Sequence, residues 1–513
     1  MIRNIVVIII LGLLTPSCMK AVCSATDVSC SAAGLLTAGI LGSSPAPLPA
    51  LPCQWGAGNA SSFYTFLGAA GVPDLAKAVC SVRDGGFLVV GGAGNVAALQ
   101  GKTPIFPYAG GASIDLFVVK LDAQGQTEWY TFIGSTGNDQ GVAVTQKPDG
   151  SFVVGSQSNA DIPTAGGKTP VNAFVAGNDF LLVQLSSTGA LDWYTFLGDT
   201  GNNQIFGLTA TPDGGVVAVG QSAADIPTMQ GKTPINPYSG GQDGLATKVD
   251  GNGNLLWYTF FGSAAGNDQA LAVTQAADSG IVISGQASLN VPTIQGLTPL
   301  NPFVSSTDAI VLKINSEGSF QWYTFFGGSS LDIAYSIVRT SDSGFIFTGQ
   351  ASANIPTMQG KTPINAYAGT NDYLVGKLNS SGSLDWYTFL GSGANDQATS
   401  VCEATDGGFL VGGYSPANIA SMQGKTPLNP YVASNDYMIA KLNSLGSISW
   451  YTFLGGAGAE LANAMAQTSS GEIVIAGSAT ANIGTIQGQT PLNAYGGGGN
   501  DEFVITMKSD GTL

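Results

Sequence analysis

Acidic side chains recur at two positions of a sequence period of 64 or 65 residues. The first set is Asp74, Asp139, Asp268, Asp332, Asp396 and Glu460, with Asn203 in the remaining place. The second set is Asp115, Asp179, Asp243, Asp308, Asp372, Asp436 and Asp501. Carboxylates gathered in a ring could bind Ca²⁺, which takes oxygen ligands. Aspartate also caps turns by accepting backbone N–H groups. We favour turn capping, because every period needs the same turn, and we predict no cofactor and no metal.

Lysine and tyrosine recur at two further positions, both in the longest polar segment of each period. The residues are Lys102, Lys168, Lys232, Lys361 and Lys425, and Tyr108, Tyr238, Tyr367, Tyr431 and Tyr495. Loops longer than about 12–15 residues inside a compact domain are often functional or packed on themselves. Because tyrosine is enriched at interfaces, these ten residues are candidates for a binding surface. In the compatible alternative, Ile, Pro and Tyr tuck each loop against its own unit.

The composition argues against several kinds of chemistry. The chain has no histidine, which excludes Ser-His-Asp and Cys-His catalytic arrangements and histidine metal sites. The formal net charge of −16 repels phosphate backbones, so we expect no nucleic-acid partner. Active sites need differentiated residues, and the repeated units are nearly alike. We therefore predict that the protein is not an enzyme.

An aromatic signature establishes the repeat that must position these residues. Phe63-Tyr64-Thr65-Phe66 is followed by six copies of Trp-Tyr-Thr-Phe. These copies begin at Trp129, Trp193, Trp257, Trp322, Trp386 and Trp450. A period of this regularity indicates a repeat architecture.

Each unit divides into four short strands, which we call A to D in chain order. In the third unit they are predicted at Gln204 to Thr211, Val216 to Gly220, Gly244 to Val249 and Leu255 to Gly262. Turn sequences rich in Asp and Gly separate A from B and C from D. The long segment from Ser222 to Gln242 joins B to C. Four short strands per unit are typical of a β-propeller blade.

The ends of the repeat region hold complementary pieces of one unit. Phe63 to Gly68 is an isolated D strand, and the chain finishes with an A-B-C set at Leu461 to Thr468, Glu472 to Gly477 and Phe503 to Lys508. Joining them pairs edges that would otherwise be exposed. We therefore predict an all-β, seven-bladed propeller over residues 61–513, in which an N-terminal strand closes the last blade and Tyr64 lies near Val504. All seven B-to-C loops are then expected on one face of the ring.

The repeat resembles a known bacterial family. The matching segments of the second unit and their counterparts are Gly134 to Ala143, Asp149 to Gly155, Asp161 to Thr164, Asp179 to Leu185 and Trp193 to Gly198. They are similar to the bacterial β-propeller repeat known as SBBP, over about residues 61–513. The resemblance implies a scaffold often found on exported proteins. It implies no activity.

The first residues predict export and lipid anchoring. Met1 to Asn4 carries one positive charge, and Ile5 to Leu14 is an apolar run too short to span a bilayer. This is the form of a secretory signal, here residues 1–17. Thr15 to Cys18 resembles a bacterial lipobox, with lipidation at Cys18; an ordinary cleaved signal is the alternative. Residues 18–60 are rich in Ala, Ser, Gly and Pro and are predicted to be a tether.

The other cysteines divide into two groups. Cys23, Cys30 and Cys53 lie in the tether, where an oxidising compartment permits one disulfide, and the sequence does not choose the pair. Cys80 and Cys402 share one repeat position in blades 1 and 6, which are not neighbours. We predict that these two are buried thiols.

These observations predict a binding or scaffolding protein of the bacterial cell envelope, adhesin-like in its use of the B-to-C loops. It would hold the membrane through its lipid anchor and bind a protein or glycan of unknown identity. The residues after Cys18 lack the aspartate often used for inner-membrane retention, which favours the outer membrane. Two alternatives remain open: a calcium-dependent hydrolase or lyase using axial carboxylates, and a self-associating structural component of the envelope.

Overall fold

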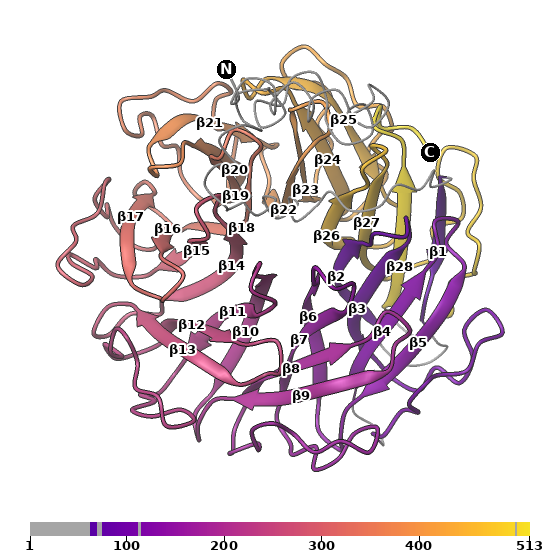
Figure 1. The fold of residues 1–513 in the computed structure, drawn as a ribbon. Coiled ribbons are helices and arrows are strands. Elements are labelled where there is room, and N and C mark those ends of the chain that lie inside the picture. The colour runs from indigo at the N-terminus through magenta and orange to yellow at the C-terminus, as the bar shows by residue number, and fades with distance from the viewer. Residues whose placement is uncertain (1–61, 69–73, 111–113, 498–499) are drawn as a thin grey trace, which may run out of the picture. The chain divides into compact units, whose positions relative to one another are not determined.

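The computed structural model describes residues 62–68, 74–110, 114–497 and 500–513. These residues form seven four-stranded antiparallel sheets arranged as blades in a ring, as predicted (Figure 1). The predicted signal peptide, Cys18, the tether and Cys23, Cys30 and Cys53 lie outside the described residues. No helix in the described part of the chain is long and apolar enough to cross a membrane.

The strands have nearly constant length in every blade. The A strands are β2 (Leu75–Ser81), β6 (Asp139–Gln146), β10 (Asn203–Ala210), β14 (Gln269–Gln275), β18 (Asp332–Arg339), β22 (Gln397–Glu403) and β26 (Glu460–Gln467). The B strands are β3 (Phe87–Ala93), β7 (Phe152–Ser158), β11 (Val216–Ser222), β15 (Ile281–Ala287), β19 (Phe345–Ala351), β23 (Phe409–Ser415) and β27 (Ile473–Ala479).

The C strands are β4 (Asp115–Leu121), β8 (Asp179–Leu185), β12 (Asp243–Val249), β16 (Asp308–Ile314), β20 (Asp372–Leu378), β24 (Asp436–Leu442) and β28 (Asp501–Met507). The D strands are β5 (Thr127–Ile133), β9 (Leu191–Leu197), β13 (Leu255–Phe261), β17 (Phe320–Phe326), β21 (Leu384–Leu390), β25 (Ile448–Leu454) and β1 (Phe63–Phe66). The predicted strands agree with these bounds to within one or two residues.

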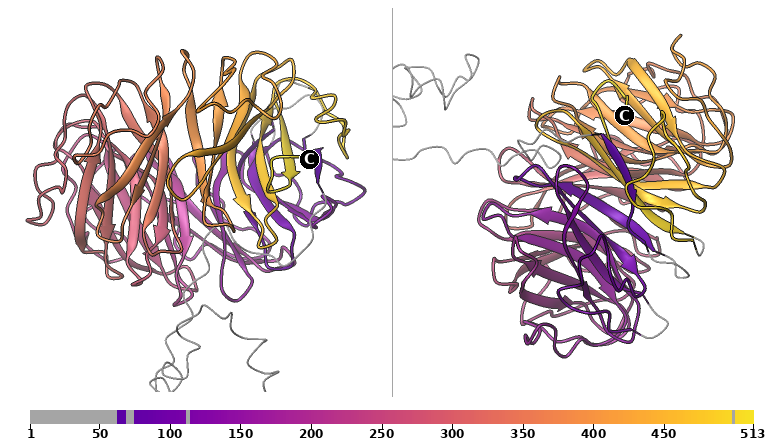
Figure 2. Two further views of the ribbon diagram at one scale, coloured as in Figure 1. Left: turned by 90° about the horizontal axis from the view of Figure 1, so that it is seen from above. Right: turned by 90° about the vertical axis from the view of Figure 1, so that its right-hand side faces the viewer.

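The A strands lie innermost and the D strands outermost. Consecutive A strands contact one another all the way round the ring, including β26 with β2 (Figure 1). Seen from the side, the blades stand next to one another with their strands running from one face of the ring to the other (Figure 2). The A-to-B and C-to-D turns therefore lie on one face, and the D-to-A connections on the opposite face.

The chain ends close the ring as predicted. β1 is the outer strand of the seventh blade and pairs antiparallel with β28, which places Tyr64 opposite Ile505 and Thr65 opposite Val504. The Phe63 N–H also donates to Thr506 Oγ1 at 2.9 Å. Tyr64 and Phe66 pack between blades 6 and 7, while Phe63 packs between blades 7 and 1. The closing strand thus joins two of the interfaces that hold the ring together.

The hydrophobic core is divided among the junctions between neighbouring blades. One cluster, for example, joins Val217 and Val219 of β11 to Ile281 and Ile283 of β15. The B and C strands are mostly buried on both faces, which explains their continuous apolar runs. Cys80 is 6% exposed and Cys402 is fully buried, as expected for two thiols placed inside blades 1 and 6.

The aromatic residue that opens the signature packs on the next blade. Trp257 lies against Gly318 in the C-to-D turn of the following blade and donates its indole N–H to Ser316 O at 2.9 Å. Gly318 has φ +88°, and a Cβ atom there would lie 3.0 Å from the Trp257 ring. Glycine is needed for both reasons. The same contact recurs at Gly125, Gly189, Gly253, Gly382, Gly446 and Gly511.

Candidate binding surfaces

The long B-to-C segments form hairpins along the outer rim, which corrects the expectation that they crowd one face. In the third blade, the Ile235 N–H donates to Tyr258 O at 2.9 Å, and the Phe260 N–H donates to Asn236 O at 3.2 Å. The hairpin thus bonds to the outer edge of β13. A D strand presents unpaired N–H and C=O groups, and backbone bonds from the loop satisfy them. The prediction was wrong because it took the long segments for free loops and gave them no contact with a sheet edge.

The tip of each hairpin reaches the far end of the D strand. Met229 and Lys232 bridge across a tight turn at Gln230-Gly231, where both residues have positive φ. The Gln230 side chain accepts the Leu255 N–H at 2.9 Å. Equivalent tip glutamines are Gln100, Gln295, Gln359, Gln423 and Gln487, and blade 2 has Gly166 there. Every hairpin therefore runs along the rim from one face of the ring towards the other.

The tyrosine of each Trp-Tyr-Thr-Phe copy ties the start of the hairpin to the blade. Tyr258 is fully buried and donates its hydroxyl to Ile226 O at 2.7 Å. The other signature tyrosines make equivalent hydroxyl bonds to hairpin carbonyls. The donor and acceptor pairs are Tyr130–Val96, Tyr194–Ile162, Tyr323–Val291, Tyr387–Ile355, Tyr451–Ile419 and Tyr64–Ile483. The tyrosine side chains of the D strands are therefore buried beneath the hairpins, where they serve packing.

The five recurring loop tyrosines are half-buried anchors of the hairpins. Tyr238 packs edge-on against Phe260 of its own blade, with ring centroids 5.7 Å apart, and its hydroxyl donates to Gly241 O. Tyr108, Tyr367, Tyr431 and Tyr495 contact Phe132, Phe389, Phe453 and Phe66 in the same way. Phe174 and Phe303 replace tyrosine in blades 2 and 4. These contacts hold each loop against its own blade, as in the alternative considered for these residues.

The recurring lysines are exposed, and the same hairpins carry exposed apolar side chains. Lys102, Lys168, Lys232, Lys361 and Lys425 are all exposed at the hairpin tips. Of the thirteen exposed large hydrophobic side chains in the described residues, ten lie in the hairpins. They are Ile105, Val171, Val175, Leu289, Leu300, Val304, Ile364, Leu428, Val432 and Leu492. Leu300 is 50% exposed and Val304 55%. The outer rim thus carries exposed apolar and cationic groups at similar positions in successive blades.

The recurring acidic residues meet in pairs at the blade junctions. Asp243 Oδ2 accepts the Ser239 N–H at 2.5 Å, and Asp268 Oδ2 of the next blade accepts the Ser263 N–H at 2.7 Å. These bonds confirm turn capping. A Cβ atom on Gly262 would lie 2.3 Å from Asp243 Oδ1 and 2.9 Å from Asp268 Oδ2, so the two carboxyl groups converge on the glycine. No group of three or more His, Cys, Asp or Glu arranged to hold a metal occurs in the described residues.

One oxygen of each C-strand aspartate is buried without a hydrogen-bond partner among the described residues. This holds for Oδ1 of Asp115, Asp179, Asp243, Asp308, Asp372, Asp436 and Asp501. Burial raises the pKa of Asp243 to about 7, with a further increase from the charge of Asp268. Burial likewise raises the pKa of Asp332 and Glu460 to about 7. A proton retained in each pair would give the orphaned oxygen a donor.

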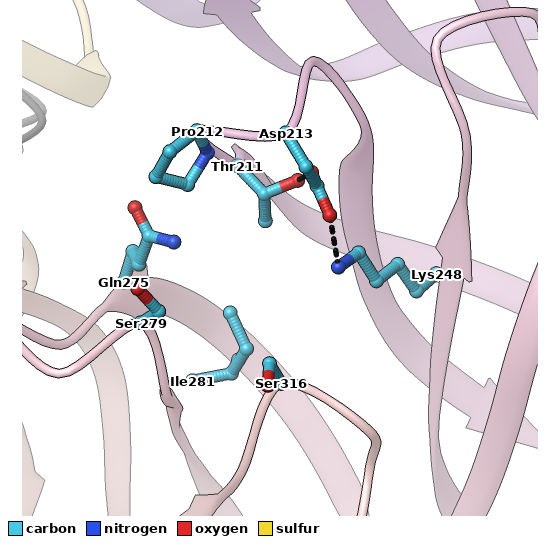
Figure 3. A pocket seen from close by; sticks show the side chains of 8 residues that line it. All are labelled: Thr211, Pro212, Asp213, Lys248, Gln275, Ser279, Ile281 and Ser316. Carbon is cyan, nitrogen blue, oxygen red and sulfur yellow. Dashed lines mark hydrogen bonds and ion pairs between the residues drawn. The ribbon is translucent and has the colours of Figure 1, made fainter. Parts of the chain in front are cut away.

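An ion pair that the sequence reasoning missed joins the C strand to the A-to-B turn. Lys248 Nζ lies 2.6 Å from Asp213 Oδ2 at the edge of a pocket of about 160 Å³ that also contacts Gln275 and Ser316 (Figure 3). Equivalent pairs are Lys120–Asp84, Lys313–Asp278, Lys377–Asp342 and Lys441–Asp406. The regular spacing of these lysines in the C strands was the available signal. Because the pair recurs in most blades, we interpret it as a structural contact that holds the A-to-B turn against the C strand.

Known proteins resemble the chain only distantly. No family model matches it. An uncharacterized WD repeat-containing protein of Acanthamoeba polyphaga mimivirus is 21% identical over 448 residues, covering 74% of this chain and 32% of that protein. The regulatory protein FlaEY of Caulobacter vibrioides is 24% identical over 305 residues, covering 56% of this chain and 31% of that protein. The chain therefore spans about a third of the length of these relatives.

Solved structures show a similarly remote likeness. Sqt1 from Chaetomium thermophilum aligns with a TM-score of 0.41 and 11% identity, over 90% of this chain and all of that chain. The assignment as a seven-bladed propeller rests on the strand pairing described above.

Proposed function

We propose that this protein is an exported binding module that holds a partner protein against the outer rim of its propeller. The observation that carries the proposal is the repeated surface of the hairpins, where exposed apolar side chains lie beside exposed lysines in successive blades. Apolar side chains that stay exposed at one repeated position favour an interaction surface. Lysines on a chain with a formal net charge of −16 favour a partner with acidic groups there.

The hairpins suit binding because they are already ordered. Each is held by backbone bonds to the D strand and by a buried tyrosine hydroxyl, and the tip glutamine adds a bond to the D strand in every blade except blades 2 and 7. Binding to a preformed surface avoids the entropy cost of ordering a loop. Contacts to several blades at once would add up through multivalency, so that weak individual contacts suffice.

The proposal also includes the cellular location of the module. The apolar run Ile5 to Leu14 and the lipobox-like Thr15 to Cys18 support export and lipid anchoring at Cys18, and the resemblance to SBBP repeats supports a place in the bacterial envelope. Metabolic labelling with an alkyne fatty acid should mark the wild-type protein and leave a Cys18→Ala variant unlabelled. Equal labelling of both proteins would remove the anchor from the proposal.

A photo-crosslinking experiment in intact cells tests the binding surface. A photoreactive phenylalanine at Leu300 on the rim should trap a partner, whereas the same probe at Leu445 in a C-to-D turn should not. Changing Lys232, Lys361 and Lys425 together to Gln should weaken the cross-link at Leu300. The control variant changes Thr188, Asn252 and Leu445 to Asp, which alters the net charge equally at the C-to-D turns.

The outcomes separate the candidate functions. A cross-link at Leu300 that the lysine variant loses and the control variant keeps supports the rim as the binding surface. A cross-linked product made of two copies of this chain would instead support the self-associating component. Equal trapping at Leu300 and Leu445 would overturn the proposal.

A further inference from the structure

Each A strand contains one β-bulge, at the same place in every blade. In β2 the register with β3 shifts between Ala76 and Ala78, which leaves Lys77 as the extra residue. The bulged residues of the other blades are Val142, Phe206, Leu271, Tyr335, Thr399 and Asn463. Bulges often lie next to functional sites, where they redirect a side chain.

The bulges belong to the A strands, which surround the axis of the ring (Figure 1). Both flanks of an A strand contact the neighbouring A strands, and its outer edge pairs with the B strand. Because these neighbours cover its other sides, we infer that surface left exposed in the middle of an A strand faces the axis. All seven bulged residues are half-buried, so each one retains some exposed surface there.

Seven blades that are otherwise nearly alike carry seven different residues at this position. The flanking positions stay mostly small, as in Ala76 and Ala78 or Ala462 and Ala464. The order round the ring separates two arcs. Val142, Phe206, Leu271 and Tyr335 form an apolar arc over blades 2 to 5, and Thr399, Asn463 and Lys77 form a polar arc over blades 6, 7 and 1. A symmetric structural role would need one residue type, so this division favours a single asymmetric ligand.

Within the polar arc, Lys77 has unused binding capacity. The Asn463 side-chain amide donates to Ala76 O at 2.7 Å, and Thr399 Oγ1 donates to Ala462 O at 3.0 Å, so both reach to the next blade. Lys77 Nζ makes no hydrogen bond or ion pair with any described residue. Burial lowers the pKa of Lys77, and no neighbouring charge offsets that effect. An anion beside Lys77 would supply that charge.

We propose that the axial end of the seven bulges binds a small amphipathic organic anion, with its acidic group against Lys77 and Asn463 and its apolar body against Phe206, Leu271 and Tyr335. Tyr335 offers a ring for stacking and a hydroxyl at its edge. The site is independent of the outer rim, because the bulges and the hairpins lie on opposite edges of each blade. Failure of one proposal therefore leaves the other standing.

Isothermal titration calorimetry of the full-length protein tests this site. The probe is 2-naphthoate, an aromatic carboxylate, and its neutral counterpart is 2-naphthamide. We expect the wild-type protein to bind naphthoate more tightly than the amide. Lys77→Met should weaken naphthoate binding about tenfold, the loss of one partly desolvated charge contact, and leave amide binding unchanged. Phe206→Ser should weaken the binding of both probes.

Two further variants make the result decisive. Lys77→Arg keeps the charge and should restore naphthoate binding. Lys508→Met removes an exposed lysine outside both proposed sites and should leave binding as in the wild type. The proposal is overturned if the wild-type protein binds no naphthoate, if Lys77→Met binds it like the wild type, or if Lys508→Met loses as much affinity. If Lys77→Met lowers the melting temperature, the Lys77→Arg variant distinguishes the two explanations. Naphthoate binding by Lys77→Arg supports the site. A Lys77→Arg variant that melts like the wild type but does not bind naphthoate contradicts it.

Discussion

The paired carboxyl groups at the blade junctions couple the stability of the ring to pH. Six junctions hold two acidic groups, and the seventh pairs Asp179 with Asn203. At this junction the Asn203 side-chain amide donates to Asp199 Oδ1 at 2.9 Å, and burial raises the pKa of Asp179 to about 6. An amide supplies a permanent donor, whereas a carboxyl group supplies one only when it is protonated. The Asn203 junction keeps one carboxyl group with a raised pKa, that of Asp179, whereas an acidic junction such as that of Asp243 and Asp268 holds two, so the acidic junctions should depend on pH more strongly.

We predict that the melting temperature falls as the pH rises from 5 to 8. Burial raises the pKa of Asp115, Asp308 and Asp372 to about 6 and of Asp243 to about 7, while an unfolded aspartate titrates near about 3.9. The folded protein then holds more protons than the unfolded chain between these values. Stability is greatest below the unfolded pKa and is lost as the pH rises through the folded pKa values. Thermal unfolding followed by circular dichroism measures the slope.

A variant that copies the natural Asn203 junction provides the control. Changing Asp268, Asp332 and Asp396 together to Asn should flatten the dependence on pH and raise the melting temperature at pH 8. A wild-type melting temperature that stays level or rises between pH 5 and 8 would contradict proton retention. The same steep slope in the triple variant would assign the effect to other groups.

At the scale of single elements, contacts to the hairpin and to the next blade account for all four residues of the aromatic signature. Trp257 packs on the next blade, and the Tyr258 hydroxyl donates to Ile226 O. Thr259 Oγ1 accepts the Asn236 N–H at 3.2 Å, and Phe260 packs edge-on against Tyr238. The signature is thus a set of contacts that fixes one hairpin to one D strand and one blade to the next. Its repetition follows from the repetition of these contacts.

We predict that Tyr258→Phe loosens its hairpin. The change leaves the buried Ile226 carbonyl without its donor, which costs about 1–3 kcal/mol. Hydrogen exchange of residues 223–242 should accelerate and the melting temperature should fall. The matched control is Tyr238→Phe, because the Tyr238 hydroxyl bonds Gly241 O at an exposed position where water can replace it. Equal effects of the two changes would contradict the anchoring role of the buried hydroxyl.

Periodicity predicts the strands of this protein better than it predicts where the long segments lie. The spacing of the Trp-Tyr-Thr-Phe copies established the blades and their number, because each copy marks one D strand. The path of the hairpins depends on bonds such as Ile235 N–H to Tyr258 O, which join a loop to a strand edge and leave no periodic sign of their own. The axial bulges were missed for a related reason: Lys77 and Phe206 share a position but no residue type, so comparison of the repeats treats them as noise.

At the scale of the whole molecule, closure of the ring is the property on which the other surfaces depend. The seventh blade combines three strands from the end of the chain with β1 from its start. Loss of β1 would expose the N–H and C=O groups of β28 and remove a partner from the last hairpin, whose Leu492 N–H donates to Tyr64 O at 2.8 Å. Both the axial position of Lys77 and the continuity of the rim require that β2 meets β26.

We predict that deletion of Ser61 to Gly68 opens the seventh blade. Phe63, Tyr64 and Phe66 are each less than 5% exposed, and removing a buried aromatic side chain costs about 3–5 kcal/mol. The melting temperature should fall by about 10 °C or more, and the free edge of β28 should promote association that size-exclusion chromatography detects. Deletion of residues 19–60 should leave the melting temperature unchanged. If the two deletions gave the same melting temperature, the pairing of Tyr64 with Ile505 would not be what holds the circle shut, because a contact that closes a ring cannot be removed without cost.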